Sequence, residues 1–117
     1  MVLTAGLDRC LVAYPIAEWT AFETRLSQLP QFDPAVMKIK RLYVSGAEDV
    51  EIDKLGRVLI PSSLRDYAEL SREVIWAGMG QHIELWDNAR FEAMRKEELG
   101  TPEARLDVAR RLAELGL

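Results

Sequence analysis

The stretch Asp53-Lys54-Leu55-Gly56-Arg57-Val58-Leu59-Ile60-Pro61-Ser62-Ser63-Leu64-Arg65 contains signals for a strand end, a tight turn, a second strand and a helix start. Just before it, Val50 and Ile52 alternate with Glu51, as in a half-buried strand. Asp is favoured at the first position of a type I turn and Gly at the fourth. A Gly with positive φ also closes hairpins that carry a bulge. The sequence therefore predicts a bulged hairpin turn over residues 53–56.

The residues after the turn predict a second strand and a short helix. Val58 and Ile60 would share one face of the strand, and Pro61 cannot continue a central strand. Ser62 or Ser63 is expected to cap a helix that runs to about residue 70. The predicted product is a hairpin whose turn stands on a rigid base.

Lys54 and Arg57 are expected to point outward from this turn. Two cations on a fixed turn suit an extended anionic partner, and nucleic acid is the first candidate. The alternative is a solvated hairpin with ordinary surface charges. The cationic run Lys38-Ile39-Lys40-Arg41 has the same two interpretations, a solvated helix face or a region that steers an anionic partner.

Composition limits the protein class. At 117 residues, with 49% hydrophobic and 29% charged residues, the chain is expected to form one soluble globular domain with a modest core. It contains no apolar run of membrane-spanning length and no secretion signal, and its only cysteine is Cys10. These features predict a cytoplasmic protein. A net charge of −4 disfavours non-specific coating of nucleic acid but leaves room for a local cationic patch.

The spacing of apolar residues and the positions of Pro, Gly and capping residues predict the other elements in order. Strands are expected over residues 2–7, 10–14, 73–79 and 82–86. A helix should follow Pro15 and stop near Pro30, with its aromatic stripe packed in the core. Further helices should run from Asp33-Pro34 to Gly46, from an Asp87 cap to Gly100, and from Thr101-Pro102 to Gly116.

An internal repeat organises the chain. Residues 5–14 align without gaps on residues 77–86, an offset of 77 − 5 = 72. The hairpin at residue 53 precedes the second copy, so its counterpart would be centred near 53 − 72 = −19. We therefore expect residues 1–46 to be an N-terminally truncated first repeat, residues 47–100 a complete second repeat, and residues 101–117 a C-terminal helix. A truncation, a misplaced start or a natural lack of one hairpin would each explain the difference.

These motifs resemble the MraZ family of bacterial regulators. The stretch of residues 53–61 with Leu64-Arg65 matches the family's Asp-x-x-x-Arg signature and its Gly-Arg-x-x-x-Pro extension. Residues 11–15 with Glu18-Trp19, and residues 84–87 with Phe91, match the strands and helix starts of the two repeats. The resemblance implies an α+β fold, an AbrB-like swapped-hairpin double-split β-barrel made from two pseudo-repeats, with flanking helices and a C-terminal helical tail.

The same resemblance implies a function. The chain would be a sequence-specific DNA-binding transcriptional regulator, a repressor of the cell-division and cell-wall gene cluster. It would bind direct repeats in promoter DNA as a ring-shaped homo-oligomer and would associate with the nucleoid. No cofactor, metal, membrane or small-molecule substrate is expected.

Four residues are the predicted DNA-binding set: Asp53, Lys54, Arg57 and Arg65. Arg57 is assigned to a base edge or a phosphate, and Lys54 to a phosphate. Asp53 is expected to shape the turn and orient Arg57, because phosphates repel a carboxylate. Arg65 is expected either to bind phosphate or to pair with a nearby acid.

Three other functions compete with this one. An enzyme is disfavoured because the chain has no zinc-ligand spacing and no Gly-rich phosphate loop. Its single histidine, His82, aligns with Cys10, and the two would form a thiol–imidazole pair only if they were close. A protein-interaction module of AbrB/antitoxin type would use the tail from residue 101. A truncated regulator that has lost DNA binding is the third.

Overall fold

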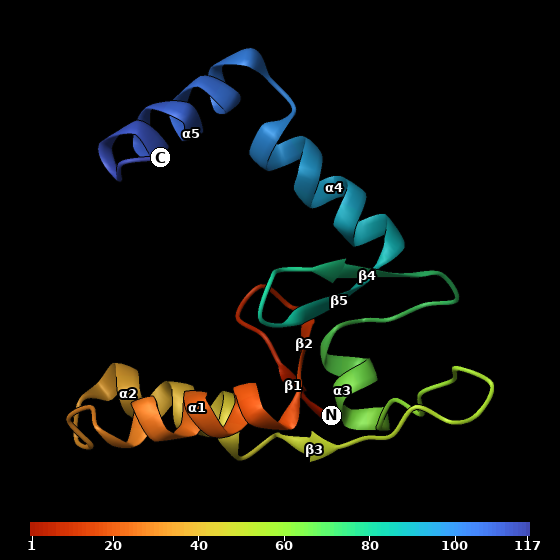
Figure 1. Ribbon diagram of the computed structural model, residues 1–117. Coiled ribbons are helices and arrows are strands. Elements are labelled where there is room, and N and C mark those ends of the chain that lie inside the picture. The colour runs from red at the N-terminus through yellow and green to blue at the C-terminus, as the bar shows by residue number, and fades with distance from the viewer. The chain divides into compact units, whose positions relative to one another are not determined.

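The computed structural model describes all residues from 1 to 117 and divides into two units, Met1–Asp87 and Asn88–Leu117 (Figure 1). The first unit holds a five-stranded antiparallel sheet in the order β3-β1-β2-β5-β4 together with helices. The predicted α+β class is therefore confirmed. The sheet is open, with β3 and β4 at its two edges, and does not close into a barrel.

The elements follow one another along the chain as in Figure 1. Those of the first unit are β1 (Val2–Ala5), β2 (Leu11–Tyr14), α1 (Ile16–Ser27), α2 (Pro34–Ile39), the π-helix η1 (Lys40–Val44), β3 (Glu48–Asp49), α3 (Ser62–Tyr67), β4 (Val74–Gly78) and β5 (Ile83–Asp87). Those of the second unit are α4 (Asn88–Leu99) and α5 (Pro102–Glu114).

The 72-residue offset relates the bounds of these elements. Adding 72 to β2 gives residues 83–86, which lie in β5, and adding 72 to α1 gives residues 88–99, the bounds of α4. At the centre of the sheet, β2 and β5 pair in antiparallel fashion with Val12 opposite Glu84. Since 12 + 72 = 84, this pair joins two equivalent positions, and a pseudo-twofold axis passes between them.

One face of the sheet forms the hydrophobic core. Leu3 of β1 and Leu11 of β2 are fully buried there, and Leu85 of β5 is almost so. Val50 and Leu64, from the segment that contains the predicted hairpin and α3, pack onto this face. Two contacts hold α3 in place, because the Tyr67 hydroxyl donates to the Gly6 carbonyl at 2.5 Å and the Arg9 guanidinium lies 5.0 Å from the Tyr67 ring centroid.

Aromatic side chains pack on the opposite face. The ring of Tyr14 on β2 lies 5.6 Å from Trp19 and 5.8 Å from Phe22 of α1 (centroid distances). Phe22 in turn lies 5.6 Å from Tyr43 of η1. The prediction that the aromatic stripe of this helix packs in the core is confirmed in part, since Trp19 and Leu26 are buried, whereas Ile16 and Leu29 are 52% and 48% exposed.

Two local predictions are wrong, and a third is confirmed in its bounds but not in its helix type. The strand expected over residues 57–60 is reduced to a single bridge between Ile52 and Val58. Neither serine caps α3, because Pro61 is the N-cap residue and Ser62 already has helical geometry. The helix from Pro34 changes to a π-helix before Gly46, where the Tyr43 carbonyl accepts from Thr4 Oγ1 at 2.6 Å instead of continuing an α-helical ladder.

The second unit consists of the two helices α4 and α5. Thr101 is the predicted N-cap of α5, and its hydroxyl accepts from the Ala104 N–H at 3.1 Å. Arg105 reaches back to donate to the Leu99 carbonyl at 3.0 Å, which joins the end of α4 to the start of α5. No helix in the structure has both the length and the apolar composition that crossing a bilayer requires.

Candidate nucleic-acid interface

The predicted hairpin turn is formed. The Asp53 N–H donates to the Arg57 carbonyl at 2.8 Å, and the Gly56 N–H donates to the Asp53 carbonyl at 3.0 Å. Gly56 has a φ of 79°, in the left-handed region that favours glycine. The result is a three-residue loop with a left-handed glycine before the closing residue, the bulged hairpin expected from the sequence.

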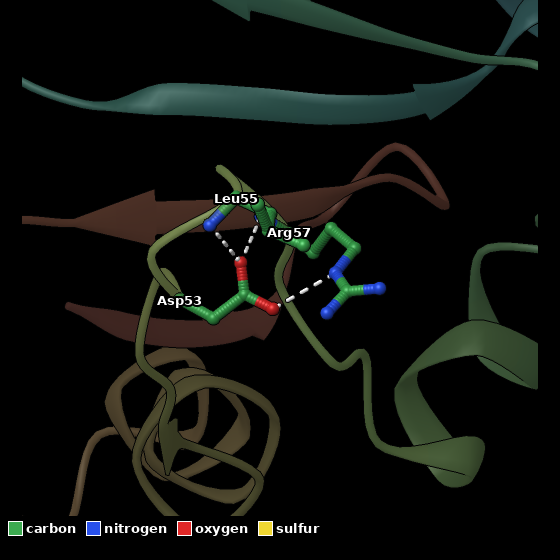
Figure 2. A network of polar contacts seen from close by, with 3 residues as sticks. All are labelled: Asp53, Leu55 and Arg57. Carbon is green, nitrogen blue, oxygen red and sulfur yellow. Dashed lines mark hydrogen bonds and ion pairs between the residues drawn. The ribbon is translucent and has the colours of Figure 1, made fainter.

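The Asp53 carboxylate organises this turn from inside (Figure 2). Its Oδ1 accepts from the backbone N–H of Leu55 at 2.9 Å and of Arg57 at 2.8 Å, while Oδ2 accepts from Arg57 Nε at 2.9 Å. The pKa of Asp53 lies below its usual value, chiefly because the Arg57 N–H bonds to the carboxylate, with the Arg57 side chain second. The deprotonated carboxylate is therefore the form that fits the turn.

This arrangement fixes the direction of Arg57. Its Nε bonds to Asp53, and of its two terminal nitrogens one points away from the carboxylate while the other lies on the carboxylate side (Figure 2). The Arg57 side chain is 73% exposed. The turn therefore holds an exposed planar guanidinium in a constrained orientation.

The other predicted cations are exposed, but the structure does not join them to this pair. Lys54 lies at the tip of the same turn without an ion pair. Arg65 lies in the last turn of α3, and no hydrogen bond or ion pair links it to the turn or to an acid. Sequence reasoning passed over Leu55 and Leu59, which are 75% and 86% exposed beside the cations. The signal available was a leucine in a turn whose other residues are polar or glycine.

Acidic residues lie close to the turn along the chain. Glu48, Asp49 and Glu51 all precede it and are exposed. The Met1 amino group lies 3.5 Å from Asp49, which compensates one of these charges. The turn therefore carries local donors within a segment that is not strongly cationic.

The structure separates the two residues of the thiol–imidazole alternative. The β2–β5 register, in which Ala13 lies opposite Ile83, continues to place His82 beside Tyr14, and their rings are 5.3 Å apart. Cys10 lies just before β2, four residues from Tyr14 along the chain and about 13 Å away at strand spacing. Burial, and then the Glu84 and Asp8 carboxylates, raise the pKa of the Cys10 thiol to about 12. Such a thiol stays protonated at neutral pH, the opposite of an activated nucleophile.

Comparison with known proteins identifies the family. The family model described as "MraZ protein, putative antitoxin-like" matches residues 43–112, more than half of the chain and including the turn. The chain belongs to the MraZ family. The resemblance seen in the sequence is thus confirmed.

Curated members of the family are similar over most of the chain. A protein of Acetivibrio thermocellus is 40% identical over 116 residues, which are 99% of this chain and 79% of that protein. One of Thiobacillus denitrificans is 41% identical over 99 residues, 85% of this chain and 67% of the relative. One of Dictyoglomus thermophilum is 46% identical over 96 residues, 82% of this chain and 66% of the relative. All three MraZ relatives are longer than the region they share with this chain, and each is named "Transcriptional regulator MraZ", a regulator rather than an enzyme.

Proposed function

We propose that this MraZ-family chain is a sequence-specific DNA-binding transcriptional regulator whose turn over residues 53–57 contacts DNA. The observation that carries the proposal is the exposed guanidinium of Arg57, held through its Nε by Asp53. The names of the relatives support the regulatory role. The full proposal is a repressor of the cell-division and cell-wall gene cluster that binds promoter direct repeats and associates with the nucleoid.

Arg57 is the residue that reads sequence in this proposal. A guanidinium that offers two parallel donors matches the O6 and N7 acceptors of guanine in the major groove, or two oxygens of a phosphate. Because Asp53 already occupies Nε and bonds to the Arg57 backbone, the side chain loses little conformational freedom on binding. Asp53 thus acts as a positioning residue.

Lys54 and Arg65 are proposed to contact phosphates. Both are exposed cations without an ion pair, so neither has to break one before it binds DNA. Such contacts set the orientation of the protein on the duplex but do not read its sequence. Each neutralised phosphate also makes binding more sensitive to salt.

A single turn supplies too few contacts for tight binding, so the proposal includes a ring-shaped homo-oligomer with the AbrB-like swapped-hairpin fold. Several turns presented to evenly spaced repeats gain affinity through effective concentration. This arrangement also explains how a chain of net charge −4 would bind DNA, because the gain comes from matched spacing and not from a basic surface.

An antitoxin-like interaction module is the second candidate. The helix α5 supports it, because Leu106 and Leu112 are 51% and 39% exposed on a helix within the matched family region. A partner protein would then cover this apolar face, and the turn would have no part in the binding.

The test is fluorescence anisotropy with DNA that carries the cluster-promoter direct repeats, with scrambled DNA as the control, at two salt concentrations. Arg57→Ala should weaken specific binding by about 1–3 kcal/mol per contacting turn, because one bidentate contact is lost. Arg57→Lys keeps the charge and loses the fork, so it should lower the preference for the repeats more than the binding to scrambled DNA.

Two further variants complete this design. Lys54→Ala should weaken binding to both DNAs and lower the salt slope by about one. Arg110→Ala, on an exposed arginine of α5 that pairs with Asp107, is the matched control and should bind like the unchanged protein. Unchanged specific binding by Arg57→Ala, with the oligomer intact, would refute the assignment of the turn.

A further inference from the structure

Leu55 is an exposed apolar residue in the loop of the Asp53 turn. Its side chain is 75% exposed, and it belongs neither to the hydrophobic core nor to the apolar residues packed against that core. Turns of this kind favour glycine, proline, asparagine, aspartate and serine, so the turn itself does not require a leucine at this position. The Leu55 side chain is therefore free to contact a partner.

The Asp53 carboxylate fixes the backbone at Leu55. Its Oδ1 accepts from the Leu55 N–H at 2.9 Å and from the Arg57 N–H at 2.8 Å, so one oxygen atom holds both residues (Figure 2). Two residues of chain span at most about 7 Å. Successive bases of one DNA strand are about 3.4 Å apart along the helix axis. A DNA surface that meets Arg57 would therefore meet Leu55 within about two base steps.

The loop leaves space for a partner between these two side chains. A Cβ atom at Gly56 would meet nothing within 4 Å, so the surface of a partner can approach the backbone there. Leu59 is 86% exposed, but it follows the bridge between Ile52 and Val58 and lies outside the loop. Leu55 is thus the large apolar side chain that the loop itself presents beside Arg57.

The chemistry of the DNA surface limits what an apolar side chain can recognise. In the major groove, all four bases present hydrogen-bond donors or acceptors, and thymine in addition presents its C5 methyl group. The leucine side chain neither donates nor accepts a hydrogen bond, so the methyl group is the base feature that matches it. Contact between the two removes apolar surface from water on both sides, which is favourable.

We propose that Leu55 is a specificity-determining residue, which contacts the C5 methyl group of a thymine within about two base steps of the base or phosphate that Arg57 contacts. This inference rests on the proposed function, because that function places the turn against DNA. The turn then recognises DNA in two ways, with hydrogen bonds from Arg57 and with an apolar contact from Leu55. The two contacts respond differently to changes in the DNA, which makes them separable.

The test replaces every thymine of the direct repeats with deoxyuridine, which removes the methyl groups and keeps the Watson–Crick pairs. Competition between the two duplexes, followed by fluorescence anisotropy, gives the ratio of their dissociation constants. The unchanged chain should bind the thymine duplex about 2- to 5-fold more tightly for each repeat contacted, the effect of burying about one methyl group. This ratio should stay constant as salt is raised, because a methyl contact releases no counterions, whereas the affinity itself should fall.

Matched variants assign the ratio to Leu55. Leu55→Asn introduces a polar residue of similar size that turns accept, and it should bind both duplexes equally. Leu55→Ala, with a shorter side chain, should also bring the ratio close to one. Leu7→Asn is the control, because Leu7 is 68% exposed in the three-residue loop between Gly6 and Cys10, and it should keep the ratio of the unchanged chain. Replacing thymines one at a time then locates the base.

The outcomes separate this inference from the proposed function. Equal binding of the two duplexes by the unchanged chain, while Arg57→Ala loses specific binding, would leave the function standing and overturn the thymine contact. A ratio that persists in Leu55→Asn would overturn it as well, including the case in which Leu59→Asn removes the ratio instead. An oligomer that dissociates in Leu55→Asn would assign this side chain to a contact between copies. Failure of the unchanged chain to prefer the repeats over scrambled DNA would overturn both.

Discussion

The hairpins β1–β2 and β4–β5 have aligned sequences but different surroundings. Leu11 is fully buried, whereas its equivalent Ile83, at 11 + 72, is 37% exposed. Both are apolar residues near the start of the second strand of their hairpin. The difference is the cover, because residues 48–67 pack on β1–β2 and no segment of this chain packs on β4–β5 in the same way. The burial of a sheet face is therefore set by the segment that covers it, and not by the strands alone.

The turns of the two hairpins also differ. Gly6 pairs with Cys10 around a three-residue loop in which Arg9 has a φ of 58°. Met79 instead pairs with His82 around two residues, and Gly80 has a φ of 96°, as in a type II′ turn. The shorter loop shifts the register by one residue, which places Trp76 on the core face where the 72-residue alignment alone would place Ile75.

Leu11 and Ile83 occupy equivalent positions in the two hairpins. Truncating each of them should give the largest difference in stability between the two hairpins. Leu11→Ala leaves a cavity in a fully buried site and should lower the free energy of unfolding by about 2–5 kcal/mol. Ile83→Ala removes a side chain that is already partly in water and should cost about 1 kcal/mol or less. Urea unfolding followed by circular dichroism measures both. Equal losses would show that the two halves are equally covered in solution.

The glycines Gly6 and Gly78 provide a second matched pair, because 6 + 72 = 78. A Cβ at Gly6 would lie 2.9 Å from both Cys10 Sγ and Val12 Cγ2, whereas a Cβ at Gly78 would meet nothing within 4 Å. Gly6→Ala should therefore destabilise by about 1–3 kcal/mol through overpacking. Gly78→Ala should be neutral or stabilise by up to about 1 kcal/mol, since it restricts the unfolded chain. Thermal unfolding separates these signs, and a destabilised Gly78→Ala protein would contradict the open edge of β4.

Much of the fold could be predicted because local signals and tertiary structure agree. The Asp53 turn follows from the preferences of Asp and Gly at fixed positions, and both N-caps with a following proline, Asp33 and Thr101, are found. The 72-residue offset anticipates the bounds of α4 from those of α1, although their surroundings differ. These features depend on neighbours in sequence, which the sequence shows directly.

The remainder depends on neighbours in space. The alternation of Val58 and Ile60 has the pattern of a strand, but a strand also needs a partner, and only one bridge to Ile52 forms. The change to a π-helix accompanies a hydrogen bond from Thr4, a residue 39 positions away. The apolar groove that Trp76 lines was missed for the same reason, although the apolar residues on both faces of β4 were a signal for it.

Within the candidate site, the roles that the residues play in forming the turn could be predicted from the sequence. The sequence predicted that Asp53 shapes the turn and orients Arg57, and the structure shows the carboxylate bonded to both the backbone and Nε of Arg57. It left two alternatives for Arg65, and the structure shows no acid paired with this residue. The contact of these side chains with DNA stays a prediction, because it depends on a partner outside the chain.

The smallest expected effect concerns the Asp53 carboxylate. This carboxylate accepts hydrogen bonds from the backbone of its own turn, and it distinguishes this turn from the otherwise similar three-residue turn between Gly6 and Cys10. The folded turn lowers the pKa of Asp53, so the carboxylate contributes stability that is present above the ordinary value of about 3.9 and is lost as the pH falls through the lowered pKa. Because the Asp53 side chain is 43% exposed and solvent screens its charge, the unfolding midpoint should barely respond. An NMR titration of the carboxyl carbon should detect the shift. In Arg57→Ala the pKa should rise only part of the way, since the backbone N–H at residue 57 remains and is the larger cause. If the pKa of Asp53 returned completely to its ordinary value in that variant, the Arg57 side chain and not the turn backbone would hold the carboxylate. Arg57 would then position Asp53, and not the reverse.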